Sequence, residues 1–392
     1  MFERPRSGER AVLVRLGLGA PVDPEDIEEF TQLALSAGAV PVATVTGSRA
    51  RPDPRYFLGS GKAAELRKVA HETAADLILV DHALSPSQER NLEKLIERRV
   101  LDRNGLILDI FAQRARSFEG KLEVELAQLK HIGSRLVRGW THLERQKGGI
   151  GLRGPGETQL ETDRRIIAQR VRVLTRRLAR IKQQRETGRQ MRAEIPVPSL
   201  ALVGYTNAGK STLFRALTGA DAYVADQLFA TLDPTVRRIH LPGGTNVVVA
   251  DTVGFIRALP HELVAAFQST LTEARAATLL LHVVDASNPR HADQIAQVDT
   301  VLAEIGASAI PQVLVYNKLD RLEGDARIDR DADGRATAVW ISAEKGRGLG
   351  LLTDAIAERL SRFTRRARLK VPPSAGALRS RLYAARAVRG ET

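Results

Sequence analysis

"LALVGYTNAGKSTLFRALTG", residues 200–219, decides the fold of the second α/β domain of this chain. An apolar run ends at Gly204, the pattern Gly-x-x-x-x-Gly-Lys-Ser continues to Ser211, and an amphipathic stretch follows. This strand, loop and helix order is typical of a phosphate-binding loop, where backbone N–H groups and a helix N-terminus surround anionic phosphates. Glycines that only turned a strand into a helix would leave the Lys-Ser pair unexplained.

The chemistry of this loop predicts specific roles for its side chains. We expect Lys210 to place its charge on the β- and γ-phosphates, and the Ser211 hydroxyl to ligate magnesium. The loop residues expected to contact the nucleotide are Gly204, Tyr205, Thr206, Asn207, Ala208, Gly209, Lys210 and Ser211.

Two further segments predict the parts that sense the γ-phosphate. "LFATLDPTVRRI" at 228–239 is expected to be a mobile loop whose Thr231 completes the magnesium shell in the triphosphate state. "DTVG" at 251–254 follows a β-branched run, from which Asp251 can reach magnesium through water. The expected metal ligands are therefore Ser211 and Thr231. The expected nucleotide contacts in these segments are Phe229, Ala230, Thr231, Leu232, Asp233, Asp251, Thr252, Val253 and Gly254.

Two further segments predict which nucleotide base the site recognises. They are "PQVLVYNKLD" at 311–320 and "VWISAEKGRGL" at 339–349. Asp320 can accept hydrogen bonds from the ring N–H and the exocyclic amine of guanine, a pair that adenine does not offer. Asn317 can donate to the base, Lys318 can pack over it, and backbone N–H groups can meet the guanine oxygen. The expected contacts are Asn317, Lys318, Leu319, Asp320, Ser342, Ala343 and Glu344. Five elements in this order predict a GTP site.

Length and composition set the organisation of the chain. A chain of 392 residues predicts two or three domains, and no apolar run is long enough to suggest membrane insertion. The absence of cysteine excludes disulfides and thiolate metal sites, and with a charged N-terminus it favours the cytoplasm. We expect four parts: an N-terminal α/β domain at 1–119, a basic helical hairpin at 120–195, a GTPase domain at 196–363 and a basic extension at 364–392. The predicted fold class is α/β, with a mostly parallel sheet in the P-loop GTPase domain.

The first part alternates apolar and amphipathic stretches. Strands are expected at 11–16, 39–46 and 76–81, and helices at 23–38, 59–74 and 85–99. Such alternation predicts a parallel sheet. "GSGK" at 59–62 opens the second helix. It is a second phosphate site, a tight turn with a capping glycine, or an RNA phosphate contact through Lys62.

The middle part carries much of the positive charge. Residues 120–195 hold 18 Lys or Arg against 8 Asp or Glu, and residues 364–392 hold 8 against 1. Apolar residues recur at spacings of three and four on both sides of a glycine-rich loop, which predicts an antiparallel helical hairpin. Its basic outer face favours an RNA surface as partner, and the alternative is a coiled-coil linker with a solvated face.

The chain resembles the HflX GTPases. The resemblance rests on "YFLGSGK" at 56–62, "GPGETQLETDRR" at 154–165, "GYTNAGKS" at 204–211, "FATLDPT" at 229–235 and "DTVGF" at 251–255. It implies a protein that binds the large ribosomal subunit and its rRNA and uses GTP to split or rescue ribosomes under stress, probing the ribosome with the middle loop. The basic tail at 364–392 matches no part of the family pattern.

Catalysis is the open question, because Phe255 stands where Ras-type enzymes carry the glutamine that orients water. The resemblance makes an apolar residue expected there. Asn207 matches the asparagine that holds potassium in related cation-activated GTPases, so the catalytic set is expected to be Lys210, Asn207 and Thr231. Asn207 could equally be a turn residue at the helix entry, and the ribosome could complete the site instead.

Two other functions remain open from the sequence. One is a GTP-dependent RNA-binding chaperone or ribosome assembly factor that never separates subunits. The other is a signalling switch acting on a protein, which predicts weak and salt-insensitive RNA binding, whereas a basic hairpin predicts a steep salt dependence. In every reading the chain is expected to be a monomer that binds GTP and GDP with Mg2+.

Overall fold

The computed structural model describes residues 8–139, 155–192, 197–219, 228–242, 244–257, 268–361, 369–384 and 388. The glycine-rich middle loop, at 140–154, lies outside these residues. The chain forms two compact units. Unit 1 comprises Met1–Leu178, Ala225–Asp233 and Arg257–Gln268, and unit 2 comprises Ala179–Val224, Pro234–Ile256 and Ser269–Thr392. The predicted domain division at residues 119, 195 and 363 stays a prediction.

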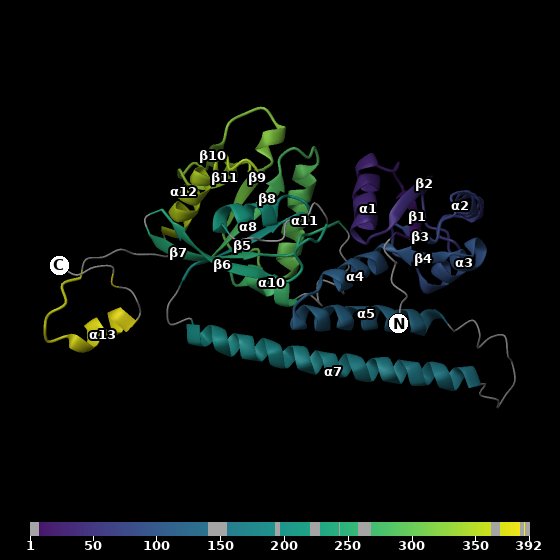
Figure 1. Ribbon diagram of the computed structural model, residues 1–392, viewed down its shortest axis with the longest axis horizontal. Helices are drawn as coiled ribbons and strands as arrows, with labels where there is room; N and C mark the ends of the chain where they lie inside the picture. The colour runs from purple at the N-terminus through teal and green to yellow at the C-terminus, as the bar shows by residue number, and fades with distance from the viewer. Residues whose placement is uncertain are drawn as a thin grey trace. The chain divides into compact units, whose positions relative to one another are not determined.

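Unit 1 is built on a four-stranded parallel sheet in the order β2-β1-β3-β4 (Figure 1). Its strands are β1 (Arg10–Leu18), β2 (Val40–Arg49), β3 (Leu77–Val80) and β4 (Arg99–Asp102). Its helices are α1 (Pro24–Ser36), α2 (Ser60–Glu72), α3 (Pro86–Ile96) and α4 (Arg103–Arg114). Helix α1 packs with α4 and α2 packs with α3, so both faces of the sheet are covered, as a parallel sheet requires.

Local sequence signals account for where these helices begin. The Asp23 carboxylate accepts the Glu25 N–H at 3.0 Å and caps α1, with Pro24 in the first turn. Ser85 and Gln88 form a reciprocal capping box at the start of α3. These caps satisfy backbone donors that the helices would otherwise leave unpaired.

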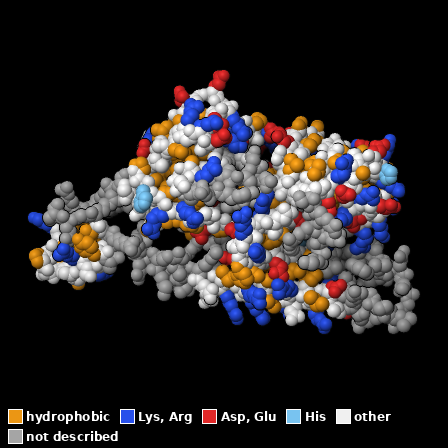
Figure 2. Space-filling view, in the orientation of Figure 1, with side chains coloured by type: hydrophobic (Ala, Val, Ile, Leu, Met, Phe, Trp, Pro, Cys, Tyr) orange, Lys and Arg blue, Asp and Glu red, His pale blue; other side chains and the backbone are white. Residues whose placement is uncertain are grey.

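Two long helices follow, α5 (Phe118–Gly139) and α7 (Pro155–Arg192). Glu125 pairs with Arg170 at 2.7 Å, and a Cβ added at Gly133 would lie 3.7 Å from Ile167, so α5 and this part of α7 are antiparallel. With 38 residues, α7 is about 57 Å long. Figure 2 shows Lys and Arg side chains along its outer edge. The exposed arginines of α7 include Arg165, Arg170, Arg172, Arg176, Arg177 and Arg180.

Unit 2 is built on a seven-stranded sheet in the order β10-β11-β9-β8-β5-β7-β6. Its strands are β5 (Ser199–Gly204), β6 (Thr235–Leu241), β7 (Thr245–Asp251), β8 (Leu279–Asp285), β9 (Gln312–Asn317), β10 (Arg327–Arg330) and β11 (Ala336–Trp340). The pairs β6/β7 and β10/β11 are antiparallel and the other pairs are parallel. The predicted α/β fold with a mostly parallel GTPase sheet is confirmed.

Helices cover the central strands of unit 2. They are α8 (Lys210–Thr218), α10 (Gln268–Arg275), α11 (His291–Glu304), the 3-10 turn η1 (Leu319–Arg321) and α12 (Leu349–Leu360), and α13 (Gly376–Ala384) follows in the tail. Helices α8 and α12 pack into the core with β5 through residues such as Leu202, Phe214 and Ile356. None of the helices in the described part of the chain is long and apolar enough to cross a membrane.

Candidate nucleotide site

The phosphate loop joins the end of β5 to the start of α8. Gly204 has φ +148°, and a Cβ there would collide with the backbone oxygen of Val283. Gly209 has φ +90°, and a Cβ there would collide with the Asn317 amide. Asn207 also lies in the left-handed region, at φ +60°, and its side chain is exposed. These positive φ values explain why the loop carries glycine at its two ends and asparagine between them.

Lys210 lies inside this loop. Its Nζ donates to the carbonyl oxygens of Gly204 at 3.1 Å and Tyr205 at 2.6 Å, and the residue is 6 % exposed. Burial lowers the pKa of Lys210 to about 8, while the charge of Asp251 opposes that shift. An ammonium held by carbonyl oxygens is in place to exchange them for phosphate oxygens, which are stronger partners for a cation.

The hydroxyl of Ser211 and the carboxylate of Asp251 form a hydrogen bond beside the phosphate loop. Ser211 Oγ donates to Asp251 Oδ2 at 2.7 Å, and Asp251, the last residue of β7, is 2 % exposed. In the described ranges no group of three or more His, Cys, Asp or Glu side chains gathers around a metal position. The pairing of one hydroxyl with one carboxylate fits magnesium, which binds through one or two protein oxygens, water and substrate phosphates. Ser211 and Asp251 are therefore the residues that can hold it.

The segment after β7 is tied to the phosphate loop. Phe255 donates its backbone N–H to Gly204 at 3.1 Å, and its carbonyl accepts the Thr206 N–H at 2.6 Å. A Cβ on Gly254 would lie 2.9 Å from the Thr206 methyl and 3.0 Å from Lys210 Nζ, so only glycine fits this approach. The Phe255 side chain is 1 % exposed. A buried ring cannot orient an attacking water.

The residues expected at the base lie at the ends of β9 and β11. The Asn317 amide donates to the Ala208 carbonyl at 2.9 Å, and its oxygen accepts the Ala343 N–H at 2.9 Å. Asn317 thus joins the phosphate loop to the Ser342-Ala343 turn. Its direct bond to the base stays a prediction.

The neighbours of Asn317 are oriented in different ways. Asp320 is exposed and accepts a hydrogen bond from the Ser342 hydroxyl, which holds the pKa of Asp320 below its usual value. Lys318 is held by Asp285 at 2.7 Å, whereas Leu319 is buried and Glu344 is exposed. An ionised, accessible Asp320 is suited to the two donors of guanine.

The segment with Thr231 belongs to unit 1. Phe229 is 3 % exposed and packs edge-on against Phe111, with ring centroids 4.6 Å apart. Leu232 is also buried, and Asp233 accepts hydrogen bonds from the backbone of Arg116 and Ser117. The side chains of Phe229, Leu232 and Asp233 therefore have partners in unit 1. The expected nucleotide contacts of residues 229–233, and the meeting of Thr231 with Ser211 at magnesium, stay predictions.

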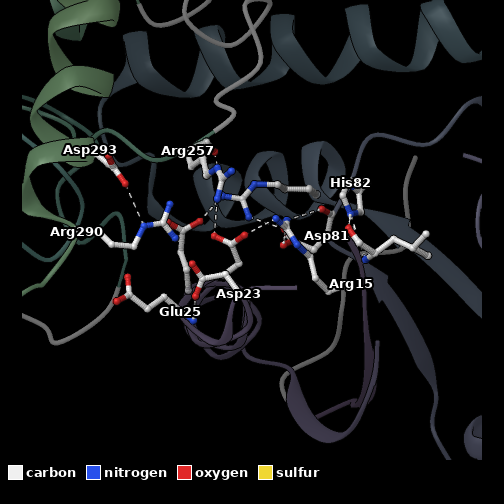
Figure 3. A network of polar contacts seen from close by, with 12 residues as sticks. Arg15, Asp23, Glu25, Asp81, His82, Arg257, Arg290 and Asp293 are labelled. Carbon is white, nitrogen blue, oxygen red and sulfur yellow. Dashed lines mark hydrogen bonds and ion pairs between the residues drawn. The ribbon is translucent and has the colours of Figure 1, made fainter. Parts of the chain in front are cut away.

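Sequence reasoning missed a second polar cluster in unit 1, at the carboxyl end of its sheet (Figure 3). Arg257, two residues after Phe255, pairs with Asp26 at 2.5 Å, and its carbonyl accepts from Arg103 at 2.9 Å. Arg103 also pairs with Asp81, whose side chain is fully buried. Asp26 and Arg257 are 231 positions apart, and no local pattern signals such a pair.

The "GSGK" stretch lies at the N-terminus of α2, beside a cavity of about 330 Å³. Arg49 donates to the Leu58 carbonyl at 3.0 Å, and Lys62 pairs with Glu65 at 2.8 Å. The residues lining the cavity are Leu16, Gly47, Ser48, Arg49, Leu58, Gly59, Ser60, Gly61 and Lys62. These pairings are consistent with a turn, and a phosphate contact of Lys62 stays a prediction.

Three family models match the chain in sequence. Residues 24–112 match the family described as GTP-binding GTPase N-terminal, residues 114–192 match the GTP-binding GTPase middle region, and residues 199–318 match the 50S ribosome-binding GTPase family. These matches follow one another along most of the chain.

Curated relatives align with all or nearly all of the chain. It is 57 % identical to GTPase HflX of Escherichia coli (strain K12) over 392 residues, which is 100 % of this chain and 92 % of the relative. It is 46 % identical over 364 residues to GTPase HflX of Caldanaerobacter subterraneus subsp. tengcongensis, covering 93 % of this chain and 83 % of that one. The crystal structure of an SsGBP–GDP complex has the same fold, with a TM-score of 0.51, 24 % identity, and coverage of 90 % of this chain and 99 % of that one. The identity across the full length shows that the chain belongs to the HflX family of P-loop GTPases, enzymes that hydrolyse GTP.

Proposed function

We propose that this GTPase binds the large ribosomal subunit and uses GTP binding and hydrolysis to split or rescue ribosomes under stress, acting as a cytoplasmic monomer. One observation carries the proposal. The long helix α7 directly precedes β5, the strand that leads into the phosphate loop, and its exposed face is arginine-rich. The match of residues 199–318 to the 50S ribosome-binding GTPase family supports the ribosome as partner. Because a polyanion releases counterions when arginines bind it, such a face suits ribosomal RNA.

Each part of the site has a role in this proposal. Lys210 and the backbone N–H groups at the start of α8 bind the phosphates, and Ser211 and Asp251 hold the magnesium ion. Magnesium neutralises charge on the β- and γ-phosphates when it is bound. Asp320, oriented by the Ser342 hydroxyl, selects guanine. Asn317 holds the base-binding segment against the phosphate loop through its hydrogen bond to Ala208.

Water positioning has to come from elsewhere, since the Phe255 ring is buried. We propose two sources. The ribosome orders the segment around Thr231 and excludes bulk water, and a potassium ion at Asn207 adds positive charge where the transition state is negative. The exposure of Asn207 leaves its side chain accessible to an ion.

The experiment that tests this function is GTP turnover by the full chain, with and without large ribosomal subunits. It is run in potassium and again in sodium at equal ionic strength. Strong stimulation by the subunits is expected, and a rate that the subunits leave unchanged would contradict the proposal. An Asn207→Ala variant that kept full potassium stimulation would remove Asn207 from the mechanism.

Splitting is separated from the alternative, an RNA-binding assembly factor, by sedimentation profiles of intact ribosomes. A splitting factor converts them to subunits when GTP is present. An assembly factor leaves intact ribosomes unchanged while it still binds the free large subunit.

A further inference from the structure

The loop 228–233 is held by unit 1 at three kinds of contact. The Leu228 N–H donates to Ser36 Oγ at 3.0 Å, and Phe229 packs against Phe111. At its far end Asp233 is hydrogen-bonded to residues that precede α5. This loop contains Thr231, which is proposed to complete the magnesium shell when the γ-phosphate is present.

The contact of Asp233 with α5 is the most specific of the three. Its carboxylate accepts the backbone N–H groups of Arg116 and Ser117, each at 2.8 Å, and the hydroxyl of Ser117. Ser117 Oγ in turn accepts the N–H of Gly120 at 2.9 Å. A carboxylate stabilises a helix N-terminus because backbone donors there are unpaired and the helix dipole is positive. Asp233 is therefore part of the N-terminal cap of α5, although it lies 116 residues away from Ser117.

Gly120 makes room for this contact. A Cβ at Gly120 would collide with Asp233 Oδ1 and would lie 3.0 Å from Ser117 Oγ. Gly120 is buried in the first turn of α5, where alanine would favour the helix by about 1 kcal/mol. Glycine at position 120 therefore lowers the stability of α5 relative to alanine. The close approach of Asp233 explains why glycine is present there.

The same side chain lies close to Thr231 along the chain. One residue, Leu232, lies between them, so their Cα atoms are at most about 7 Å apart even in extended backbone. A movement of Thr231 toward or away from a γ-phosphate is therefore expected to shift Asp233 relative to α5. Helix α5 is the first of the two long helices, and it packs along α7 through the Glu125–Arg170 pair.

We propose that Asp233 is a positioning residue that couples the nucleotide state to helix α5, so that exchange of GDP for GTP changes the cap of α5. The inference rests on the proposed function, because it takes Thr231 as the residue that responds to the γ-phosphate. Because α5 packs along α7, a change in the cap of α5 is expected to affect α7, the helix with the arginine-rich face.

Two glycine variants in the same helix test the coupling. Gly120→Ala displaces Asp233, whereas Gly133→Ala adds the same methyl group at an ordinary 3.7 Å from Ile167. Both raise the helix propensity of α5 by a similar amount, and they differ in that only Gly120→Ala displaces Asp233. Ser117→Ala removes the hydroxyl of the cap, and Ser85→Ala is its control, since the Ser85 hydroxyl caps a different helix, α3.

The measurement is hydrogen exchange at the amides of the first turns of α5, in the full chain with saturating Mg-GDP or a slowly hydrolysed GTP analogue. In the parent protein the exchange rates are expected to differ several-fold between the nucleotides. The difference is expected to disappear in Gly120→Ala and to shrink in Ser117→Ala, and to persist in Gly133→Ala and Ser85→Ala. Equal rates in both nucleotides, or a difference that survives in Gly120→Ala, would overturn the coupling.

Fluorescent GDP and GTP-analogue binding, and turnover with large ribosomal subunits, are measured on the same samples. A parent protein that binds both nucleotides and responds to the subunits, with α5 indifferent to nucleotide, overturns only this inference. A parent protein that ignores the subunits, with α5 sensitive to nucleotide, overturns the proposed function and leaves the coupling in place. A protein that binds neither nucleotide overturns both.

Discussion

The side-chain amide of Asn317 donates to the Ala208 carbonyl at 2.9 Å and so links the end of β9, where the base is expected, to the phosphate loop. The same side chain accepts the Ala343 N–H, and all three residues are buried. The two halves of the candidate nucleotide site are therefore linked directly by protein–protein hydrogen bonds. Preorganisation of this kind raises affinity because fewer groups have to be ordered on binding.

Asn317→Ala is expected to weaken GDP and GTP binding together. It leaves the Ala208 carbonyl and the Ala343 N–H without this partner, and an unsatisfied buried group costs about 1–3 kcal/mol. The nucleotide then has to order the loop as it binds, and a cost of about 1.4 kcal/mol lowers its affinity about tenfold. Fluorescent-nucleotide titration measures it, with the exposed Asn246→Ala as control. Unchanged affinity for both nucleotides would show that the link does not organise the site.

Ser211→Ala is expected to abolish the effect of magnesium on nucleotide binding. The variant removes the hydroxyl that lies 2.7 Å from Asp251 and leaves the phosphate-binding backbone in place. Affinity measured with magnesium should fall at least about tenfold to the value measured with EDTA, because one of the few protein ligands is lost. Thr218→Ala, at the other end of α8, is the control. A variant that still binds more tightly with magnesium would exclude Ser211 as a ligand.

His282 is expected to make the protein less stable as pH falls. It is 1 % exposed in β8, and burial lowers its pKa to about 4 from 6.5, although Asp299 acts in the opposite direction. The unfolded chain therefore binds a proton at higher pH than the folded one. The contribution is complete above pH 6.5, and it is lost between pH 6.5 and 4. At pH 5 the loss is about 2 kcal/mol.

Denaturant unfolding at pH 7 and pH 5 measures this effect. His282→Gln should lose about 2 kcal/mol less between the two pH values than the parent protein, whatever its stability at pH 7. The exposed His240→Gln serves as control and should keep the full dependence. An identical pH dependence in His282→Gln and the parent protein would rule out His282 as its source.

Local patterns account for the elements that were predicted correctly. The strand expected at 11–16 is part of β1, and the helix expected at 23–38 is α1, with the Asp23 cap in place. Strand β4 (Arg99–Asp102) was missed because only its two central residues are apolar and α4 begins directly after it. Strand β3 is equally short, but its four residues are all apolar, and such a run indicates a buried strand.

In the candidate site, too, features that depend on adjacent residues were predicted, and contacts between distant segments were not. The turn from Gly204 to Ser211 is specified by adjacent residues, because positive φ values and helix entry are local demands. The contact of Asp233 with Ser117 depends on the packing of segments 116 positions apart. Nothing in "FATLDPT" distinguishes an aspartate that faces a nucleotide from one that caps a distant helix. Such pairs require the structure.

Arg103→Met is expected to destabilise unit 1 by about 3–5 kcal/mol, the usual result of removing one partner from a buried ion pair. Arg103 pairs with Asp81 at 2.5 Å, and the Asp81 side chain is fully buried. Denaturant unfolding measures the change, and Arg67→Met, on the exposed face of α2, is the control. Adding Asp81→Asn to Arg103→Met should recover part of the loss, because it removes the uncompensated charge. A change of less than 1 kcal/mol in Arg103→Met would show that Arg15, which also pairs with Asp81, is sufficient.

The arginine face of α7 is expected to set the salt dependence of RNA binding. Replacing Arg172, Arg176 and Arg180 by Gln removes three exposed charges that neutralise phosphates in the proposed complex. Each phosphate contact contributes about 0.7–0.9 to the slope of log K against log salt, so the slope should fall by about 2–3. Titration of large-subunit rRNA over a range of potassium concentrations measures it.

A second triple variant separates a specific face from net charge. Arg215, Arg237 and Arg238 are also exposed, on α8 and β6, and their replacement by Gln removes the same total charge. If α7 is the binding face, this control should keep nearly the full salt slope, because charges outside the contact are screened within about 10 Å. Equal reductions in both triple variants would instead mean that net charge alone attracts RNA, and α7 would lose its assignment as the RNA-binding face.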